Sequence, residues 1–88
     1  FFSGSPIKRT GRDRFVRNVM IAIGNSGDAA LADVAEKRLR DESPLVRAMA
    51  VWALARLAPG ARFEQCKAQH LPQEKDAEIR AEWRAIRA

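Results

Sequence analysis

The side chains most able to do chemistry in this 88-residue chain are basic, and they are concentrated near its start. Residues 1–17 contain five Lys or Arg side chains and one acid, whereas residues 18–88 contain eleven basic and ten acidic side chains. Concentrated positive charge indicates an anionic partner, because Lys and Arg at an exposed edge neutralise nucleic-acid phosphates. We therefore predict contact with an RNA backbone by six residues: Lys8, Arg9, Arg12, Arg14, Arg17 and Asn18. The alternative is a solvated basic arm without a ligand.

Three of these residues fall on the first predicted helix, beside the basic arm. Successive residues of an α-helix are about 100° apart, which places Arg14 about 40° from Asn18, on the face opposite the apolar stripe. Asn18 could bind a base edge or a phosphate, or equally the backbone of the incoming arm. Arg17 could bind phosphate or pair with a carboxylate of the next helical unit, and both readings stay open.

No other set of residues indicates catalysis or a bound metal. His70 has no second His, Cys or acid at metal-ligand spacing, so we expect a surface or partly buried histidine. Cys66 is predicted to be a small core residue, and Trp52 and Trp83 to be core aromatics rather than base-stacking platforms. The sequence has no Gly-rich phosphate loop, nucleophile–base pair or paired catalytic carboxylates, so these 88 residues alone do not predict an enzyme.

Composition and length limit the class of protein. Hydrophobic residues are 47% of the chain, which is typical of a globular protein, and the length corresponds to one small domain. No apolar run of about 18 residues is present, so no membrane span is expected. A lone cysteine cannot form an internal disulfide, which favours a reducing, cytoplasmic location. The chain starts without Met, and we expect a piece of a longer protein that is monomeric.

The elements that must position the basic residues are all predicted to be helices, because no strand-like alternation or hairpin turn occurs. The central helix begins at Pro44 after an N-cap at Ser43 and ends at Pro59-Gly60. Residues 1–12 are predicted to be an extended arm. The other helices are expected from Asp13 to about Ile23, from Asp28 to about Arg40, from about Ala61 to Gln69, and after Asp76.

Each predicted helix carries an apolar stripe that indicates its buried face. The last helix has acids, Glu78 and Glu82, where earlier helices have apolar residues, as expected at the end of a stack. The residues predicted to point inward are Phe15, Val16, Val19, Met20 and Ile23 on the first helix, Leu31, Val34, Ala35 and Leu39 on the second, Val46, Met49, Ala50, Ala53, Leu54 and Leu57 on the third, Phe63 and Cys66 on the fourth, and Ile79, Trp83 and Ile86 on the last.

The first, third and fifth helices repeat one phrase: a capping residue, two residues, a branched apolar residue and an arginine. It occurs at Asp13–Arg17, Ser43–Arg47 and Asp76–Arg80, with spacings of 30 and 33 residues. A period of this size with two helices per unit indicates an α-solenoid. The segment Asp41–Leu54 resembles the second helix of a HEAT repeat, so we predict a short all-α solenoid of HEAT-like repeats with about five helices. We expect Arg47 and Arg80 to pair with carboxylates or carbonyls of a neighbouring unit, the available acids being Asp13, Asp41, Glu42 and Asp76.

The segment Gly4–Gly27, GSPIKRTGRDRFVRNVMIAIGNSG, resembles the start of the C-terminal HEAT-like domain of epoxyqueuosine reductases. The resemblance implies an oxidoreductase family that uses cobalamin and 4Fe-4S clusters to complete queuosine at the wobble position of certain tRNAs. It also implies that residues 1–12 are a basic arm or linker after a missing catalytic and iron–sulfur part, and that residues 13–88 form the HEAT-like domain. The family's cluster cysteines are not in this sequence, so no cofactor is expected in this chain.

The resulting functional prediction is an accessory domain of a tRNA-modifying oxidoreductase. By resemblance, this domain would help to hold the tRNA anticodon stem-loop beside the active site, and would dock on its own upstream iron–sulfur domain. The alternative is a structural or protein-interaction domain without RNA contact. An independent HEAT-like scaffold is a third possibility.

Overall fold

The computed structural model describes the backbone of residues 6–85 and the side chains of residues 11–85. Within this range the chain forms five α-helices, two short 3-10 helices and no strand, which confirms the all-α prediction. In order these elements are α1 (Pro6–Ser26), η1 (Ala29–Leu31), α2 (Ala32–Arg38), α3 (Pro44–Leu57), α4 (Ala61–His70), η2 (Leu71–Gln73) and α5 (Ala77–Ala85).

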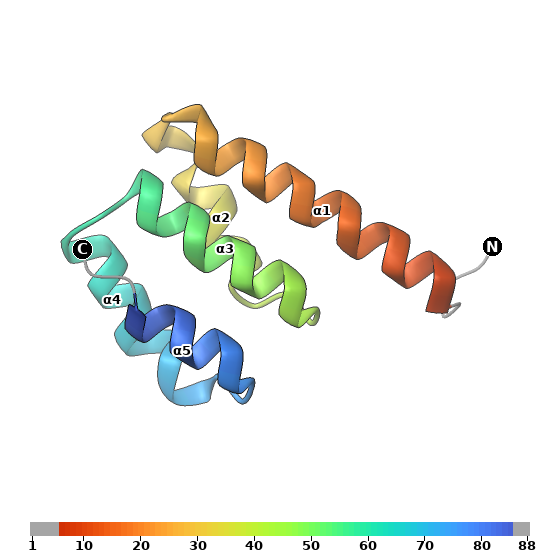
Figure 1. Cartoon of the computed structure of the whole chain (residues 1–88). Coiled ribbons are helices and arrows are strands. Elements are labelled where there is room, and N and C mark those ends of the chain that lie inside the picture. The colour runs from red at the N-terminus through yellow and green to blue at the C-terminus, as the bar shows by residue number, and fades with distance from the viewer. Residues whose placement is uncertain (1–5, 86–88) are drawn as a thin grey trace.

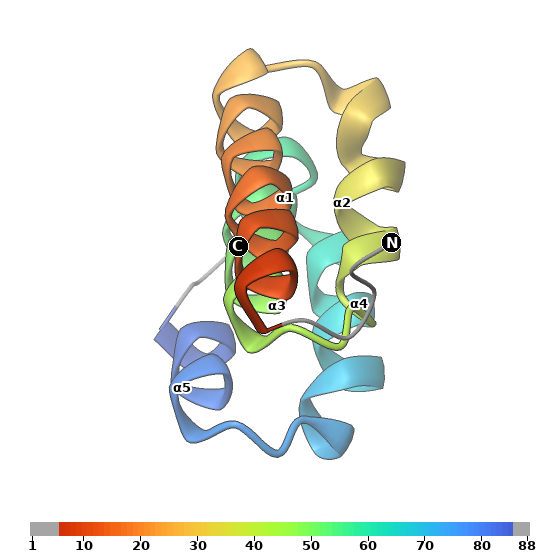
Figure 2. The ribbon, with the colours of Figure 1, turned by 90° about the vertical axis from the view of Figure 1, so that its right-hand side faces the viewer.

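The helices lie in two layers. Helices α1, α3 and α5 lie side by side in one layer, and α2 and α4 form the other (Figures 1 and 2). Helix α3 packs against α1, α2 and α5, so it is the central element that the sequence predicted. The result is a flat stack of 42 × 28 × 16 Å, built as a solenoid builds its successive helical pairs.

Local signals in the sequence explain where most helices begin and end. The Ser43 hydroxyl accepts a hydrogen bond from the Val46 N–H, and Pro44 occupies the first turn of α3. Asp76 caps α5 by accepting from the N–H of Glu78 and of Ile79. Gly60 has a φ of 93°, which favours glycine, and it separates α3 from α4.

The core lies between the two layers and is closed at the α5 end by aromatic side chains. Trp83 and Phe63 are fully buried, with ring centroids 5.2 Å apart. Most of the predicted inward positions outside α1 are confirmed, and Met20 on α1 is buried as well. The predicted side chains that are buried are Met20, Ala35, Leu39, Val46, Ala50, Ala53, Leu54, Leu57, Phe63, Cys66, Ile79 and Trp83. Ile86 and residues 1–5 lie outside the described residues.

Helix α1 is longer at both ends than the sequence predicted. It begins at Pro6, so residues 6–12 are helical and the prediction of an extended arm over them is wrong. Pro6 occupies the first position of the helix, where its fixed φ is favourable and its missing N–H costs nothing. Asp13 therefore lies inside the helix and is not its N-cap. The helix continues past Ile23 to Ser26 and ends before Gly27, whose φ is 70°.

Three side chains predicted to be buried are exposed. Phe15 is 70% exposed and Val19 is 36% exposed, because α3 covers only one side of α1 and these two residues lie away from it. Val34 on α2 is 37% exposed. Helix α1 thus has a second apolar side that no element in the described part of the chain covers.

Candidate nucleic-acid interface

Helix α1 presents polar side chains from the predicted RNA-binding set on one surface. Arg14 and Asn18 are exposed and one turn apart, and Arg17 beside them is half-buried. The three lie within about 100° of one another around the helix. None of them hydrogen-bonds or ion-pairs with any residue in the described part of the chain. We call Arg14, Arg17 and Asn18 the α1 surface.

Two further predicted residues, Lys8 and Arg9, belong to the same helix. Their backbone forms part of the first turns of α1, but their side chains lie outside the described residues. The prediction that they contact RNA therefore stays a prediction.

Arg12 does not belong to the α1 surface, because two carboxylates bind its guanidinium. It donates to Asp41 from Nη1 to Oδ1 at 2.9 Å and from Nη2 to Oδ2 at 2.7 Å, and to Oδ1 of Asp13 at 3.0 Å. The Asp41 side chain is only 3% exposed. The hydrogen bonds from Arg12 are the largest cause that lowers the pKa of Asp41 below its ordinary value, and the same bonds raise the pKa of Arg12. Arg12 therefore fastens α1 to the loop that precedes α3.

The junction between α3 and α5 repeats this arrangement with other residues. Arg47 donates to both carboxylate oxygens of Glu74, at 3.0 and 3.1 Å. Glu74 also accepts from the backbone N–H of Asp76 at 3.0 Å, as Asp41 accepts from the N–H of Ser43 at 3.0 Å. Each carboxylate precedes a helix cap by two residues, orders that turn and binds an arginine of the preceding helix in its layer.

Arg17 and Arg47 occupy the same position in the repeated phrase, but their surroundings differ. Asp41 is the counterpart of Glu74 in the preceding unit. The arginine that binds it is Arg12 and not Arg17. Because α1 extends back to Pro6, Arg12 lies on the same helix more than one turn before Arg17, and it is Arg12 that binds the Asp41 carboxylate between the two units. Arg17 therefore does not pair with a carboxylate in the described part of the chain, and its contact with phosphate stays a prediction.

The structural role predicted for Arg47 and Arg80 is confirmed. Arg47 also donates to two carbonyl oxygens of the loop before α3, at 2.8 and 3.1 Å. Arg80 donates to the carbonyl oxygens of Leu71 and Glu74, both at 3.0 Å. The carboxylate partner of Arg47 was not among the acids predicted for it, since Asp76 uses its side chain to cap α5.

The core roles predicted for the two tryptophans are also confirmed. Trp52 is half-buried between α1 and α3, where a Cβ atom on Gly24 would overlap its ring. The guanidinium of Arg56 lies 5.2 Å from the centre of that ring, and its Nε donates to the Gly24 carbonyl oxygen at 3.0 Å. Trp83 is 1% exposed. Trp83 is thus enclosed in the core, and Trp52 packs against it partly buried.

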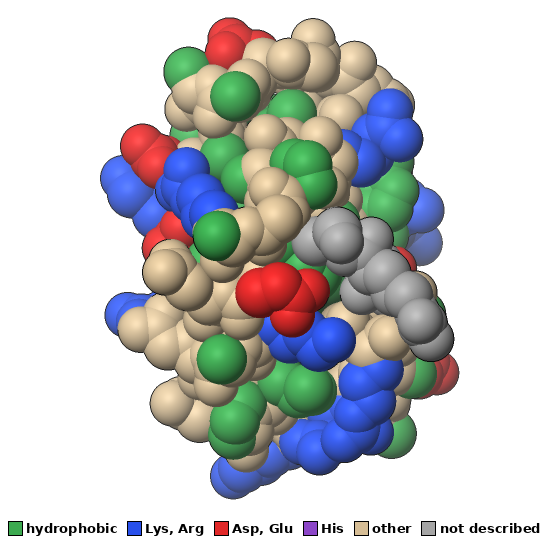
Figure 3. All heavy atoms as spheres, turned by 90° about the vertical axis from the view of Figure 1, so that its left-hand side faces the viewer, with side chains coloured by type: hydrophobic (Ala, Val, Ile, Leu, Met, Phe, Trp, Pro, Cys, Tyr) green, Lys and Arg blue, Asp and Glu red, His purple; other side chains and the backbone are tan. Residues whose placement is uncertain are grey.

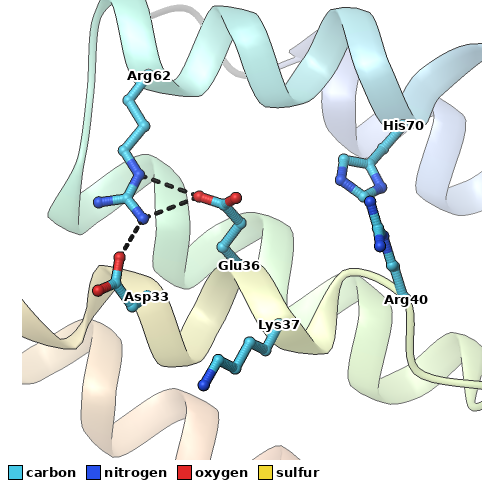
Figure 4. A pocket seen from close by; sticks show the side chains of 6 residues that line it. All are labelled: Asp33, Glu36, Lys37, Arg40, Arg62 and His70. Atoms are coloured by element: carbon cyan, nitrogen blue, oxygen red, sulfur yellow. Dashed lines mark hydrogen bonds and ion pairs between the residues drawn. The ribbon is translucent and has the colours of Figure 1, made fainter.

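The sequence analysis missed a second concentration of charge, in a hollow of about 450 Å³ between α2 and α4 (Figure 4). Arg62 on α4 donates to Asp33 at 2.5 Å and to Glu36 at 3.1 and 2.8 Å, and so connects the two helices. Arg40 and His70 lie at the other end of this hollow. His70 is half-buried, and burial is the largest cause that lowers its pKa. The available signal was the spacing of two acids one turn apart on α2.

Basic side chains are not restricted to α1. Figure 3 shows the end of the molecule at which α1 finishes: Lys and Arg side chains gather along its lower edge and lie on both sides, and acidic side chains lie near the middle, at the top and on the left. The charge surplus near the start of the chain therefore identifies one candidate interface rather than the whole basic surface.

The described residues contain neither a group that could hold a metal ion nor a helix that could span a membrane. Within residues 6–85, no group of three or more His, Cys, Asp or Glu side chains could hold a metal ion. Iron–sulfur clusters are held by several cysteine thiolates, whereas Cys66 is alone and buried, and burial raises the pKa of its thiol. The residues present do not fit such a cluster. Among the described helices, none is long and apolar enough to cross a membrane.

Comparison with known proteins identifies one HEAT repeat in the chain and two similar proteins. Residues 31–61 match the HEAT repeat. The chain is 43% identical over 53 residues to the epoxyqueuosine reductase of Xanthomonas campestris pv. campestris, and 42% identical over 60 residues to that of Alicycliphilus denitrificans. Each match covers 59% of this chain, but only 15% and 17% of the two relatives. No solved structure matches the chain. The chain is therefore an all-helical protein with a HEAT repeat, similar over more than half its length to a small part of epoxyqueuosine reductases.

Proposed function

We propose that this chain binds the tRNA substrate of an epoxyqueuosine reductase-like enzyme, through the α1 surface. The similarity to two epoxyqueuosine reductases supports the substrate class. The observation that carries the proposal is that Arg14 and Arg17 lie on one side of α1 without a bonding partner in the described part of the chain. Guanidinium groups match phosphate geometry, and proteins grip RNA stems largely through phosphate and 2′-OH contacts. Asn18, next to them, can bond a 2′-OH or a base edge.

In this proposal the chain is a non-catalytic region of a longer cytoplasmic protein. The reductase chemistry, with its cobalamin and 4Fe-4S clusters, belongs to residues outside these 88. Lys8 and Arg9 belong to the same helix, since residues 6–12 continue α1 without a break, and in this proposal they contact further phosphates. The anticodon stem-loop is the part of the tRNA that would lie along α1.

Salt-dependent binding tests the proposal. Fluorescence anisotropy with a labelled anticodon stem-loop should show weaker binding by the double variant Arg14→Gln/Arg17→Gln. The slope of log K against log salt should also become shallower by about 0.7–0.9 for each lost phosphate contact. A matched control, Lys67→Gln/Arg84→Gln, removes the same charge from α4 and α5. Its slope of log K against log salt should stay close to that of the wild type. Equal slopes for the wild type and the Arg14/Arg17 variant would contradict the proposal.

The second candidate function is docking to the iron–sulfur domain without RNA contact. Phe15 is 70% exposed and Val19 is 36% exposed at the uncovered side of α1, which suits an apolar partner surface. The double variant Phe15→Ser/Val19→Ser should then weaken association with a separately produced iron–sulfur domain, and Arg14→Gln/Arg17→Gln should leave RNA binding by the full-length protein unchanged. Loss of RNA binding in that variant, with association intact, would count against docking.

A further inference from the structure

A pair of adjoining hollows lies on the side of the molecule formed by α2 and α4, and Arg40 and His70 line both of them. The first hollow, of about 450 Å³, is also lined by Asp33, Glu36, Lys37 and Arg62 (Figure 4). The second, of about 370 Å³, lies between residues 39–42 and 73–75. Arg40 is in the loop after α2 and His70 ends α4, so the hollows meet where these two elements approach each other.

The acids of the first hollow are already bound by another arginine. Arg62 donates to Asp33 at 2.5 Å and to Glu36 at 3.1 and 2.8 Å. Figure 4 shows these bonds at one end of the hollow and the side chains of Arg40 and His70 at the other. Both carboxylates of this hollow are therefore bound by Arg62, and neither of them bonds to Arg40.

The acids of the second hollow are engaged as well. Arg12 binds both oxygens of Asp41, and Arg47 binds both oxygens of Glu74. Glu42, which also lines this hollow, is not free either. Arg40 thus lies among carboxylates that have other partners.

Arg40 itself forms no hydrogen bond or ion pair with any residue in the described part of the chain. Its charge acts on the His70 ring and lowers the pKa of that ring, a smaller effect than burial and one that Glu36 and Glu74 oppose. The His70 ring also stacks on Trp83, with centroids 6.4 Å apart and an angle of 7° between the planes. The ring is therefore held in place beside a guanidinium whose charge lacks a counter-ion within the described residues.

We propose that Arg40 and His70 together bind a phosphate group, and that Lys75, which lines the second hollow beside them, adds positive charge to the site. A guanidinium can donate two parallel hydrogen bonds to phosphate oxygens, and an imidazole N–H can donate a third. The ligand is an oxyanion of the phosphate class, either free phosphate or the phosphate of a nucleotide chain. The site lies on the layer of α2 and α4, so it does not depend on the function proposed for α1.

The chain has a single histidine, which makes its ring an unambiguous reporter in NMR titrations. At constant ionic strength, millimolar inorganic phosphate should raise the pKa of His70 by about one pH unit relative to chloride, because an anion within about 4–6 Å favours the charged imidazolium. In Arg40→Gln the rise should disappear. In the control Arg84→Gln, which removes an exposed positive charge from α5, it should remain. The amide spectrum of each variant reports whether its fold is kept.

The source of the phosphate is decided by a second titration with a dinucleotide whose only anionic group is its phosphodiester. A response to both probes assigns the site to a nucleic-acid backbone, whereas a response to inorganic phosphate alone assigns it to free phosphate or a monoester. A His70 titration that is the same in phosphate and in chloride would overturn the proposal. So would a phosphate response that persists in Arg40→Gln, or one that is lost equally in Arg84→Gln.

Discussion

The ion pair between Arg12 and Asp41 should contribute measurably to the stability of the whole stack. Its two hydrogen bonds, of 2.9 and 2.7 Å, join a carboxylate that is 3% exposed to a guanidinium that is 42% exposed. Exposed pairs contribute about 0.2–1 kcal/mol, and removing one partner of a buried pair costs about 3–5 kcal/mol. Since only one partner is buried here, we expect a coupling energy of about 1–2 kcal/mol. A loss of about 2 kcal/mol would lower the Tm of a chain of this size by roughly 8–16 °C.

A double-mutant cycle measures this coupling. The free energy of unfolding in urea is compared for the wild type, Arg12→Gln, Asp41→Asn and the double variant. The control pairs Asp41→Asn with Arg14→Gln, whose side chain does not bond to Asp41, so those effects should add to within about 0.5 kcal/mol. A coupling energy below about 0.5 kcal/mol in the first cycle would refute the view that Arg12 fastens α1 to the loop before α3.

The same pair predicts the direction of a pH effect. The pKa of Asp41 is lowered on folding from an unfolded value of about 3.9, so the folded state binds fewer protons near that pH. The stability that Asp41 contributes is therefore present above the unfolded pKa and is lost as the pH falls through the folded pKa. The difference in unfolding free energy between the wild type and Asp41→Asn should be largest near neutral pH and should shrink in acid. A difference that does not change with pH would exclude the carboxylate charge as its cause.

The remaining predictions concern packing. Gly24→Ala should cost about 1–3 kcal/mol in urea unfolding, because the new Cβ atom overlaps the Trp52 ring, whereas Gly11→Ala meets nothing within 4 Å and should stabilise α1 by about 0.5–1 kcal/mol. Equal effects would contradict the close approach of Trp52 to α1. Leu54→Ala, at a fully buried position, should cost about 2–5 kcal/mol, and Leu45→Ala, at a 43% exposed one, less than about 1 kcal/mol. Cys66 should react with an aromatic disulfide reagent only as the chain unfolds, because its thiol is buried and its pKa is raised; fast reaction of the folded chain would show that α4 is not seated as described.

The fold could be predicted from sequence where a signal is local and has one meaning. Ser43, Pro44 and Gly60 set the limits of α3, because a hydroxyl cap, a first-turn proline and a positive-φ glycine each satisfy a specific need of the backbone. The extended arm predicted for residues 1–12 was wrong over residues 6–12, because the fixed φ of a proline such as Pro6 suits the first turn of a helix as well as an extended segment. The burial of Phe15 was wrong for a different reason: periodicity shows that a side of a helix is apolar, but it does not show whether a neighbour covers that side.

The candidate site was predictable in part. Charge counting selected α1, and the helical spacing placed Arg14 and Asn18 on one side of it. The partners of the arginines were not predictable, because the sequence does not show which of several nearby carboxylates caps a helix and which one faces an arginine. Asp76 caps α5, whereas Glu74 binds Arg47. Which acid binds Arg47 depends on the three-dimensional arrangement, since several acids lie within reach along the sequence.

Asp41 also decides which arginines of α1 can bind a ligand without losing a stabilising bond. If Arg12 were to bind an RNA phosphate, it would leave Asp41, whose side chain is 3% exposed, with one guanidinium fewer to compensate its charge. Its closest remaining cation would be Arg38, at 3.6 Å. Binding through Arg14 or Arg17 breaks no bond within the described residues, so their phosphate contacts carry no such penalty. Arg12→Gln should consequently lower stability more than it changes the salt slope of RNA binding, and the Arg14/Arg17 variant should do the reverse. The opposite effects of these variants on stability and on the salt slope distinguish a basic residue that stabilises the repeat from one that binds the ligand.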